Sequence, residues 1–565
     1  MTRERDSATV PPPRPGVVRY LPLGGHGHVG RNCAVLETDA GIVILDCGVD
    51  FPDDDQLGID VILPDMRYLI EREERLLGLV LTHGHMDHIG AVVWLLKEVD
   101  IPVYGPPFAL ALVREALREA GIADGVALRP IHAGSTFTLG DFSFEALHVN
   151  HSIPQTLAMA IETPVGLWIH SADFKIDLDP VDEPPIDLPR LGALGDQGVR
   201  VLLSDSTNIE REGFSGSERS ARQGILDVVS SASGRVFITL FSTNVARVQS
   251  AVLAAEATGR RVVPFGWSLQ RNIRIARELG LLRLTQDDLI VDPEQASDLP
   301  RDQILVLTTG SQGEARAGLS RLVRGDGRGL RMERGDTVVF SSRIIPGNER
   351  GVYALRDNLA RAGIHVVAEG DHRVVHVSGH AYRDEHRTLI RLLRPDLLIP
   401  VHGDYRFLRA QAELGEQLGV GATQVMDNGM VLEVSSSGAR VTSTIALRPQ
   451  VVEGTSLAEL GGPSMRERAK LAKAGLCVVR VVVDRDTGAL LDGPLLLGRG
   501  ISDEGDDDQQ IEEARGAAEE AFRDLPDSAR REARAVEEAL RTAVRRTFRR
   551  ISQRKPIVEV MVSLV

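Results

Sequence analysis

The sequence predicts a mixed α/β protein of two or three domains, and three observations support this prediction. Its 565 residues are too many for one ordinary domain. From Val17 to Leu147, short β-type runs are separated by glycine-rich turns. After Ser215 the pattern changes to a regular alternation of β-type and amphipathic helical runs, which is typical of a doubly wound parallel sheet.

The first half of the chain divides into a tail and a layered α/β region. Residues 1–16 are polar and proline-rich with no apolar core, so we expect a disordered tail and no secretory signal. Residues 17–214 contain β-type runs such as "CAVLET" and "GIVILDCG" and helical periodicity at 89–99 and 108–120. We expect a mixed α/β domain with its polar side chains presented at strand ends.

The second half begins with the doubly wound region, residues 215–375, with strands such as "RVFITLFS" and "QILVLTTG". Residues 376–448 return to strands and one strong helix. The stretch 449–466 contains "EGTSLAELGGPS" and is predicted to be a linker by its composition. Residues 467–565 predict a small α/β C-terminal domain with an acidic loop at 503–508 and two charged helices.

Composition excludes several classes of protein. The chain has three cysteines, which rules out a disulfide framework and fits a cytoplasmic location. No apolar run approaches the roughly 18 residues that a membrane span needs, so we expect no membrane association. The net charge of −15 argues against loose, charge-driven coating of nucleic acid, although a local basic channel or bound metal ions remain compatible with it.

The strongest chemical signal is "LVLTHGHMDHIG", residues 79–90. His83 and His85 are two apart and share a face in an extended turn, while Asp87 and His88 lie where a helix begins. Imidazole and carboxylate groups suit zinc or manganese. The motif therefore predicts a metal site.

One turn cannot complete two metal sites, so further ligands are expected from other strand ends. Candidates are His151 in "NHSIP", Asp173 in "HSADFK" and His402 in "LIPVHGDYR". His148 and His170 compete with the first two, and spacing alone does not decide among them.

These segments together resemble a known family. "THGHMDH" is similar to the His-x-His-x-Asp-His signature of the metallo-β-lactamase superfamily. "LGGHGHVGRN", "SDSTN", "GSQGE", "IPGNE" and "HVSGHA" resemble bacterial ribonuclease J, of the β-CASP nuclease branch, from about Tyr20 to the end of the chain. The resemblance implies a metallo-β-lactamase αββα sandwich, interrupted by an inserted doubly wound β-CASP domain and followed by the small C-terminal domain.

The resemblance also implies a ligand set for two divalent ions per subunit. It assigns one ion to His83, His85 and His151, the other to Asp87, His88 and His402, and a bridging position to Asp173. It implies that Asp46 in "LDCG" orients the site. Zinc is expected, with manganese or magnesium as alternatives, and such a pair suits hydroxide attack on a phosphodiester.

Two further roles follow from the same resemblance. Asp205 and His380 are expected to supply the proton for the leaving oxygen. The segment from His376 through Val377, Ser378 and Gly379 to His380 is expected to bind the 5′ phosphate of RNA, although "SGH" is also compatible with a plain tight turn. A bound 5′-monophosphate predicts 5′→3′ exonuclease activity, with endonuclease activity when RNA enters without using this pocket.

Other interpretations remain open at this stage. His402 favours RNA over DNA by analogy with the two β-CASP branches, which leaves a DNA-processing nuclease as the rival. A small-ester hydrolase and a non-catalytic RNA-binding scaffold are less consistent with the phosphate motif and the intact ligands. "FPDDDQ" at 51–56 is compatible with a calcium site or a solvated loop, and the arginine-rich helix at 533–550 with RNA contact, a solvated face or a subunit contact.

The expected partner is single-stranded RNA, in maturation and mRNA decay. The resemblance further implies a homodimer or tetramer formed through the C-terminal region, and membership of an RNA-degradation complex.

Overall fold

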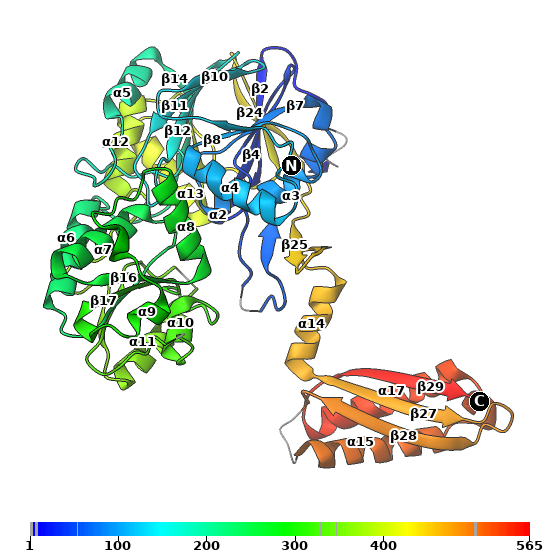
Figure 1. Cartoon of the computed structure of the whole chain (residues 1–565). Coiled ribbons are helices and arrows are strands. Elements are labelled where there is room, and N and C mark those ends of the chain that lie inside the picture. The colour runs from blue at the N-terminus through cyan, green and yellow to red at the C-terminus, as the bar shows by residue number, and fades with distance from the viewer. Residues whose placement is uncertain (1–3, 6–9, 54, 328, 346, 502–505) are drawn as a thin grey trace. The chain divides into compact units, whose positions relative to one another are not determined.

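The computed structural model of the chain describes residues 4–5, 10–53, 55–327, 329–345, 347–501 and 506–565 (Figure 1). The chain divides into two compact units. The first contains residues up to Asp50 and Leu63–Pro449, and the second contains Phe51–Ile62 and Gln450–Val565. Among the described residues, no helix is long and apolar enough to cross a membrane.

Two large sheets form the centre of the first unit. The nine-stranded sheet has the order β1-β24-β23-β2-β4-β5-β7-β8-β9, and the seven-stranded sheet has the order β10-β11-β12-β13-β14-β20-β22. The first comprises β1 (Glu4–Arg5), β2 (Val17–Gly24), β4 (Cys33–Thr38), β5 (Gly41–Leu45), β7 (Leu76–Val80), β8 (Val103–Gly105), β9 (Leu128–Pro130), β23 (Met430–Ser435) and β24 (Gly438–Ile445). The second comprises β10 (Thr136–Leu139), β11 (Phe142–His148), β12 (Leu157–Thr163), β13 (Gly166–His170), β14 (Val199–Asp205), β20 (Leu397–Val401) and β22 (Ala422–Thr423).

One hydrophobic core lies between these two sheets. Tyr20 and Leu432 from the first sheet pack with Phe144 and Trp168 from the second, and all four are buried. A separate core on the outer face of the second sheet includes Leu389. The helices of this region are α1 (Arg67–Ile70), α2 (Met86–Ile89), α3 (Val92–Leu96), α4 (Pro107–Glu119), α5 (Leu188–Gln197), α12 (Arg383–Leu393) and α13 (Tyr405–Gln417). The αββα sandwich is therefore confirmed.

A third sheet is inserted into this sandwich. β14 and β20 are parallel neighbours although about 190 residues separate them, as the pairing of Val201 with Leu397 shows. The intervening sheet is parallel throughout, in the order β16-β17-β15-β18-β19. Its elements are α6 (Glu218–Ser231), β15 (Val236–Thr239), α7 (Val245–Thr258), β16 (Arg261–Phe265), α8 (Trp267–Glu278), α9 (Pro293–Ala296), β17 (Ile304–Thr308), α10 (Gly318–Val323), β18 (Thr337–Phe340), α11 (Glu349–Arg361) and β19 (His365–Val367). Residues at both ends of helix α7 explain where it begins and ends. The Asn244 side chain caps the first turn, and Gly259, whose own backbone is in the left-handed region, follows the last turn.

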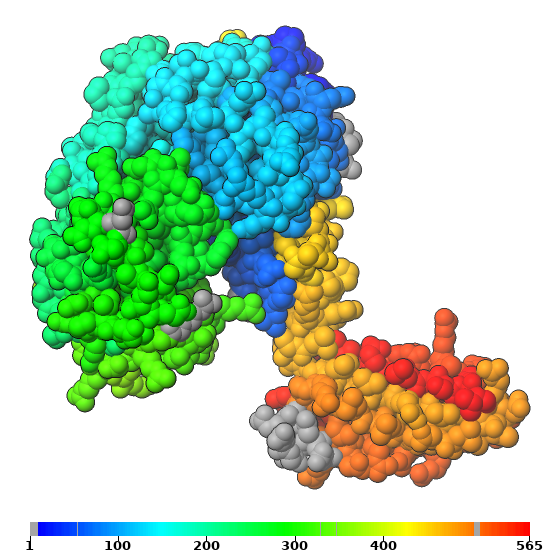
Figure 2. Space-filling model, in the orientation of Figure 1, coloured from blue at the N-terminus to red at the C-terminus, as the bar shows by residue number. Residues whose placement is uncertain are grey.

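The inserted region packs directly against the sandwich. Figure 2 shows the green surface of the insertion meeting the cyan surface of the preceding region. Arg274 of α8 forms an ion pair of 3.0 Å with Glu115 of α4. The two parts of the first unit are thus in contact along this face.

The second unit is built on a three-stranded sheet in the order β28-β27-β29. Its strands are β27 (Leu476–Val483), β28 (Leu490–Arg499) and β29 (Ile557–Leu564), and its helices are α14 (Pro463–Ala474), α15 (Asp506–Arg523), α16 (Asp527–Arg530) and α17 (Ala533–Ile551). Val479 of the sheet packs with Ala518 of α15 and Phe548 of α17. Both long helices therefore cover one face of this sheet.

Two expectations from the sequence differ from the structure. The predicted linker, 449–466, contains a hairpin of β25 (Gln450–Glu453) and β26 (Ser456–Glu459) that pairs with β6 (Val61–Leu63). The consecutive residues Val451 and Val452 of this hairpin are both buried. Within the predicted disordered tail, Glu4–Arg5 pair with β24 and Val10 is buried. Residues 1–3 and 6–9 of that tail, and 503–505 of the acidic loop, lie outside the described residues.

Candidate functional site: a two-part histidine and aspartate centre

The sequence motif at 79–90 lies in the turn that joins β7 to α2. His83 is fully buried, and His85 directly precedes the short helix. Asp87 and His88 lie within that helix. The turn thus contributes His83 and His85 to one group of side chains and Asp87 and His88 to another.

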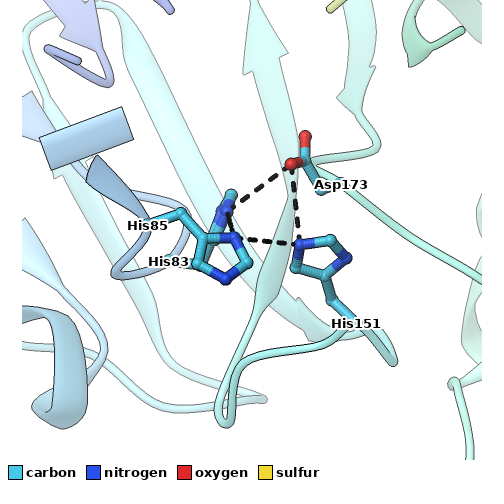
Figure 3. Close-up of side chains that lie close together, drawn as sticks. All are labelled: His83, His85, His151 and Asp173. Carbon is cyan, nitrogen blue, oxygen red and sulfur yellow. Dashed lines mark hydrogen bonds and ion pairs between the residues drawn. The ribbon is translucent and has the colours of Figure 1, made fainter. Parts of the chain in front are cut away.

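Figure 3 shows the first group, in which His83 and His85 meet His151 and Asp173. His151 follows β11 and Asp173 follows β13. His85 Nδ1 lies 3.1 Å from both His83 Nε2 and His151 Nε2. Asp173 Oδ2 lies 3.5 Å from His83 Nε2 and 3.7 Å from His151 Nε2. These atoms converge closely enough to ligate one cation.

The second group joins Asp87, His88 and His402 to the same aspartate. His402 follows β20, and its Nε2 lies 3.2 Å from Asp87 Oδ2. Asp173 Oδ2 lies 3.3 Å from His88 Nε2 and 3.5 Å from His402 Nε2. One carboxylate oxygen therefore faces four histidines, two from each group, which is the position of a bridging ligand.

The outer nitrogens of the His88 and His151 rings are held by other parts of the protein. His88 Nδ1 lies 2.8 Å from Asp46 Oδ2, and this carboxylate also accepts hydrogen bonds from the backbone and hydroxyl of Thr82. His151 Nδ1 donates to the Gly379 carbonyl at 2.6 Å. Such contacts fix ring orientation and leave Nε2 free for a metal. Asp46 thus contacts the His88 ring on the side away from the converging atoms.

The backbone is strained at three positions of the site. Asp46, Ala172 and His402 all have positive φ, at 56°, 53° and 51°. Residues other than glycine seldom adopt this region, and holding one there costs about 1–3 kcal/mol. His402 belongs to the second group, Ala172 directly precedes Asp173, and Asp46 contacts His88.

Electrostatics at the site favour a bound cation. Burial lowers the pKa of His83 and His151 well below the usual range and that of His85 to about 4, which keeps these rings in the neutral form that binds metals. Burial also acts to lower the pKa of His88, but the surrounding carboxylates, Asp173 first, raise it to about 10. The carboxylates thus draw positive charge into the space between the two groups.

Asp205 and His380 lie together at the edge of this centre. Asp205 is fully buried, and its Oδ2 lies 2.8 Å from His380 Nδ1. The His380 ring lies 4.8 Å from that of His151 and 5.3 Å from that of His402, measured between centroids. Its side chain is 22% exposed, so it is accessible from solvent, whereas Asp205 supports it from the interior.

The segment 376–380 forms a compact turn beside these residues. Ser378 Oγ accepts a hydrogen bond from the His380 amide and donates to the His380 carbonyl. A Cβ at Gly379 would lie 2.7 Å from Cβ of Ser152, so close packing alone requires glycine here. Both the predicted anion-binding role and the tight-turn alternative are compatible with this geometry.

Other sequence candidates are not brought into the centre. His148 contacts the Pro184 carbonyl, and His170 Nδ1 accepts a hydrogen bond from the backbone of Ala172. Within the described residues, the groups able to hold a metal include neither histidine nor the 51–56 loop. Asp54 of that loop lies outside the described residues, and the calcium site there stays a prediction.

Two residues that the sequence analysis does not single out form hydrogen bonds at or next to the site. Asn32 Nδ2 lies 3.1 Å from both the Asp87 carbonyl and His88 Nε2. Arg247, in the inserted region, is fully buried and donates to the Val375 carbonyl directly before the 376–380 turn. Asn32 lies within the quoted "GRN" motif, whereas no sequence signal distinguishes Arg247 from other helix arginines.

Family models match four parts of the chain. Residues 26–184 match the metallo-β-lactamase superfamily, and 233–359 match the ribonuclease J β-CASP domain. Residues 350–425 match a Zn-dependent metallo-hydrolase RNA specificity domain, and 463–565 match the ribonuclease J C-terminal domain.

Curated relatives agree over nearly the whole length. Ribonuclease J of Mycobacterium tuberculosis is 42% identical over 88% of this chain and 89% of its own length. Ribonuclease J 1 of Streptococcus pyogenes is 35% identical over 97% and 98%, and ribonuclease J2 of Bacillus subtilis is 33% identical over 96% and 97%.

A solved structure of a protein of unknown function from Enterococcus faecalis has a TM-score of 0.53 at 14% identity, covering 74% of this chain and 99% of its own, and supports the fold alone. Sequence relatives, family models and the converging histidines and aspartates lead to the same assignment. The chain belongs to the ribonuclease J family and is a metal-dependent hydrolase of RNA phosphodiester bonds.

Proposed function

We propose that this ribonuclease holds two divalent ions, zinc in preference to manganese or magnesium, and degrades 5′-monophosphorylated RNA in the 5′→3′ direction, with endonucleolytic cleavage as a second mode. The observation that carries the proposal is the single oxygen of Asp173 that faces both groups of histidines. His83, His85 and His151 would hold one ion and Asp87, His88 and His402 the other. When bound, the pair would supply hydroxide at neutral pH and stabilise the negative charge that develops on the phosphate.

The protein's own residues would orient this centre and handle the leaving group. Asp46 fixes the His88 ring through its Nδ1 atom. His380 is the accessible member of its pair with Asp205, so it would donate the proton to the 3′ oxygen as that oxygen leaves. Asp205, which is buried, would hold the His380 ring in position.

The 376–380 turn would bind the terminal phosphate. It lies beside the centre because Gly379 accepts the hydrogen bond from His151. Asn208 Nδ2 donates to Ser378 Oγ at 3.1 Å and adds a further polar group at this turn. A phosphate held here would place the first phosphodiester at the metal centre, which explains removal of nucleotides one at a time from the 5′ end.

The proposed assembly is a homodimer or tetramer formed through the second unit. The face of its sheet that is opposite α15 and α17 carries exposed apolar side chains, including Leu495, Leu497 and Met561, each more than half exposed. Exposed apolar patches of this kind mark interaction sites. Analytical ultracentrifugation of the wild type and of Leu495→Lys/Leu497→Lys tests it, since the variant should sediment as a monomer.

The activity test compares RNA with a 5′-monophosphate, 5′-triphosphate or 5′-hydroxyl end, beside DNA of the same sequence. The wild type should release mononucleotides from monophosphorylated RNA. His151→Ala should abolish this release, whereas His148→Ala, three residues away and outside the centre, should retain it. Equal cleavage of DNA would favour the DNA-processing rival, and RNA binding without cleavage would favour a scaffold.

The phosphate pocket needs its own variant. Ser378→Ala should lower the preference for the 5′-monophosphate over the 5′-hydroxyl while leaving internal cleavage intact. An unchanged preference would contradict the role of the turn in binding the terminal phosphate.

A further inference from the structure

A basic groove lies within the second unit, which contains none of the residues of the metal centre. It has a volume of about 610 Å³ and is bounded by α14, α17 and the segment that leads into β29. Its cationic lining consists of Lys470, Arg545, Arg546, Arg549 and Lys555, all exposed, and its one acidic lining residue is Glu467. Five cations thus face one anion on a chain whose net charge is −15.

The groove arginines project from the solvent side of α17. The opposite side of this helix carries Val544 and Phe548, which are buried against the sheet. Arg545 and Arg549 are four residues apart and therefore about 6 Å apart along the helix axis. Like charges at this spacing destabilise a helix by about 0.2–0.5 kcal/mol per pair. The fold thus retains an unfavourable row of charge.

The three arginines of the groove differ from neighbouring arginines in having no partner among the residues that the structure describes. Arg550 pairs with Glu513, and Arg515 pairs with Glu512 at 2.7 Å. By contrast, no ion pair or side-chain hydrogen bond joins Arg545, Arg546 or Arg549 to any residue in the described part of the chain. The positive charge of the groove is therefore available to an external anion.

We infer that this groove binds the phosphodiester backbone of RNA, independently of sequence. Arginine and lysine bind phosphate oxygens strongly, and a row of them suits a chain of phosphates better than a single one. The groove lining contains no aromatic residue on which bases could stack. The inference rests on the proposed ribonuclease function, and it predicts that the groove strengthens the binding of long substrates without taking part in hydrolysis.

The test compares two double variants that remove the same charge from the same domain. Arg545→Gln/Arg549→Gln alters the groove, and Arg515→Gln/Arg550→Gln removes arginines that have internal partners. Binding of a 30-nucleotide, cleavage-resistant phosphorothioate RNA to the full-length protein is measured by fluorescence anisotropy over a series of salt concentrations. Each lost phosphate contact lowers the slope of log affinity against log salt by about 0.7, so the groove variant should lose about 1.4 from this slope.

The groove variant should also bind the RNA several-fold more weakly, while the control double variant keeps the wild-type affinity and slope. Hydrolysis of a five-nucleotide RNA should keep its kcat in both variants. Equal slopes in wild type and groove variant would overturn the inference. The inference would also be overturned if the groove variant lost binding to polyglutamate but kept its binding to RNA, since an acidic protein segment would then be the occupant. A third contrary result would be that inorganic phosphate displaces the bound RNA as effectively as unlabelled RNA does.

Failure of the proposed function would appear differently. A wild type that cleaves no RNA would contradict that function, whereas the groove would still be identified by the difference between the two salt slopes.

Discussion

Replacing Arg247 with methionine should strongly destabilise the first unit. Its guanidinium is fully buried and donates to both carboxylate oxygens of Glu218, at 2.9–3.2 Å, and to Ser341 Oγ and the Val375 carbonyl. Without it, the buried Glu218 carboxylate keeps Lys175 as its nearest cation, 4.0 Å away. Breaking a buried ion pair by removing one partner costs about 3–5 kcal/mol, and we expect a loss in this range.

Two further variants separate the unpaired charge from the lost packing. Arg247→Met/Glu218→Gln removes the stranded carboxylate and should recover a large part of the loss. Arg274→Met breaks ion pairs with Glu115 and Glu278, but the Arg274 side chain is 48% exposed, so this variant should lose much less stability than Arg247→Met. The matched pair of arginines thus tests burial rather than charge alone.

Urea denaturation followed by circular dichroism measures the free energy of unfolding of all four proteins. The reasoning would be refuted if Arg247→Met stayed within about 1 kcal/mol of the wild type, or if the double variant were no more stable than the single one. The same experiment bears on function, because Arg247 donates a hydrogen bond to the Val375 carbonyl, directly before the 376–380 turn that is proposed to bind phosphate.

Three other outcomes follow from the structure. Asp46→Asn should lower metal affinity or activity by about 10–100-fold, because the His88 ring loses its orienting carboxylate; wild-type values in metal titrations would contradict this. Burial raises the pKa of Glu183 to about 8, so the folded state retains a proton that the unfolded state releases near its ordinary pKa of 4.5. Stability should therefore fall as pH rises from 4.5 to 8, and Glu183→Gln should flatten this fall in pH-dependent urea denaturation. Cys33, Cys47 and Cys477 are buried, and burial raises the pKa of the Cys477 thiol to about 12. All three thiols should therefore resist alkylation by iodoacetamide at pH 8 until the protein is unfolded, with the number of alkylated cysteines counted by mass spectrometry.

The local order of the metal site could be predicted from the sequence, because one turn carries four of its side chains. The choice of His151 over His148 could not be made from spacing, since both lie at the end of β11 and differ only in where the loop directs them. The resemblance to the family made that choice, and the geometry agrees with it. The two-strand hairpin at 450–459 within the predicted linker could not be predicted from the sequence, because its short strands pair with a segment about 390 residues earlier.

Long-range contacts explain the remaining gaps. Asp46 and His402 have positive φ values that their residue types do not predict, because the surrounding structure holds the backbone there. No sequence signal separates Arg247 from other helix arginines, because the groups that enclose it, Glu218, Ser341 and Val375, are far apart along the chain.

Metal content per chain is the most direct test of the central claim that Asp173 joins two groups of metal ligands. After incubation with excess zinc and dialysis to remove unbound metal, the wild type and His148→Ala should each contain two ions per chain by inductively coupled plasma mass spectrometry. Asp173→Ala should contain fewer than two and should fail to hydrolyse RNA. Two ions per chain and wild-type hydrolysis in Asp173→Ala would contradict the account.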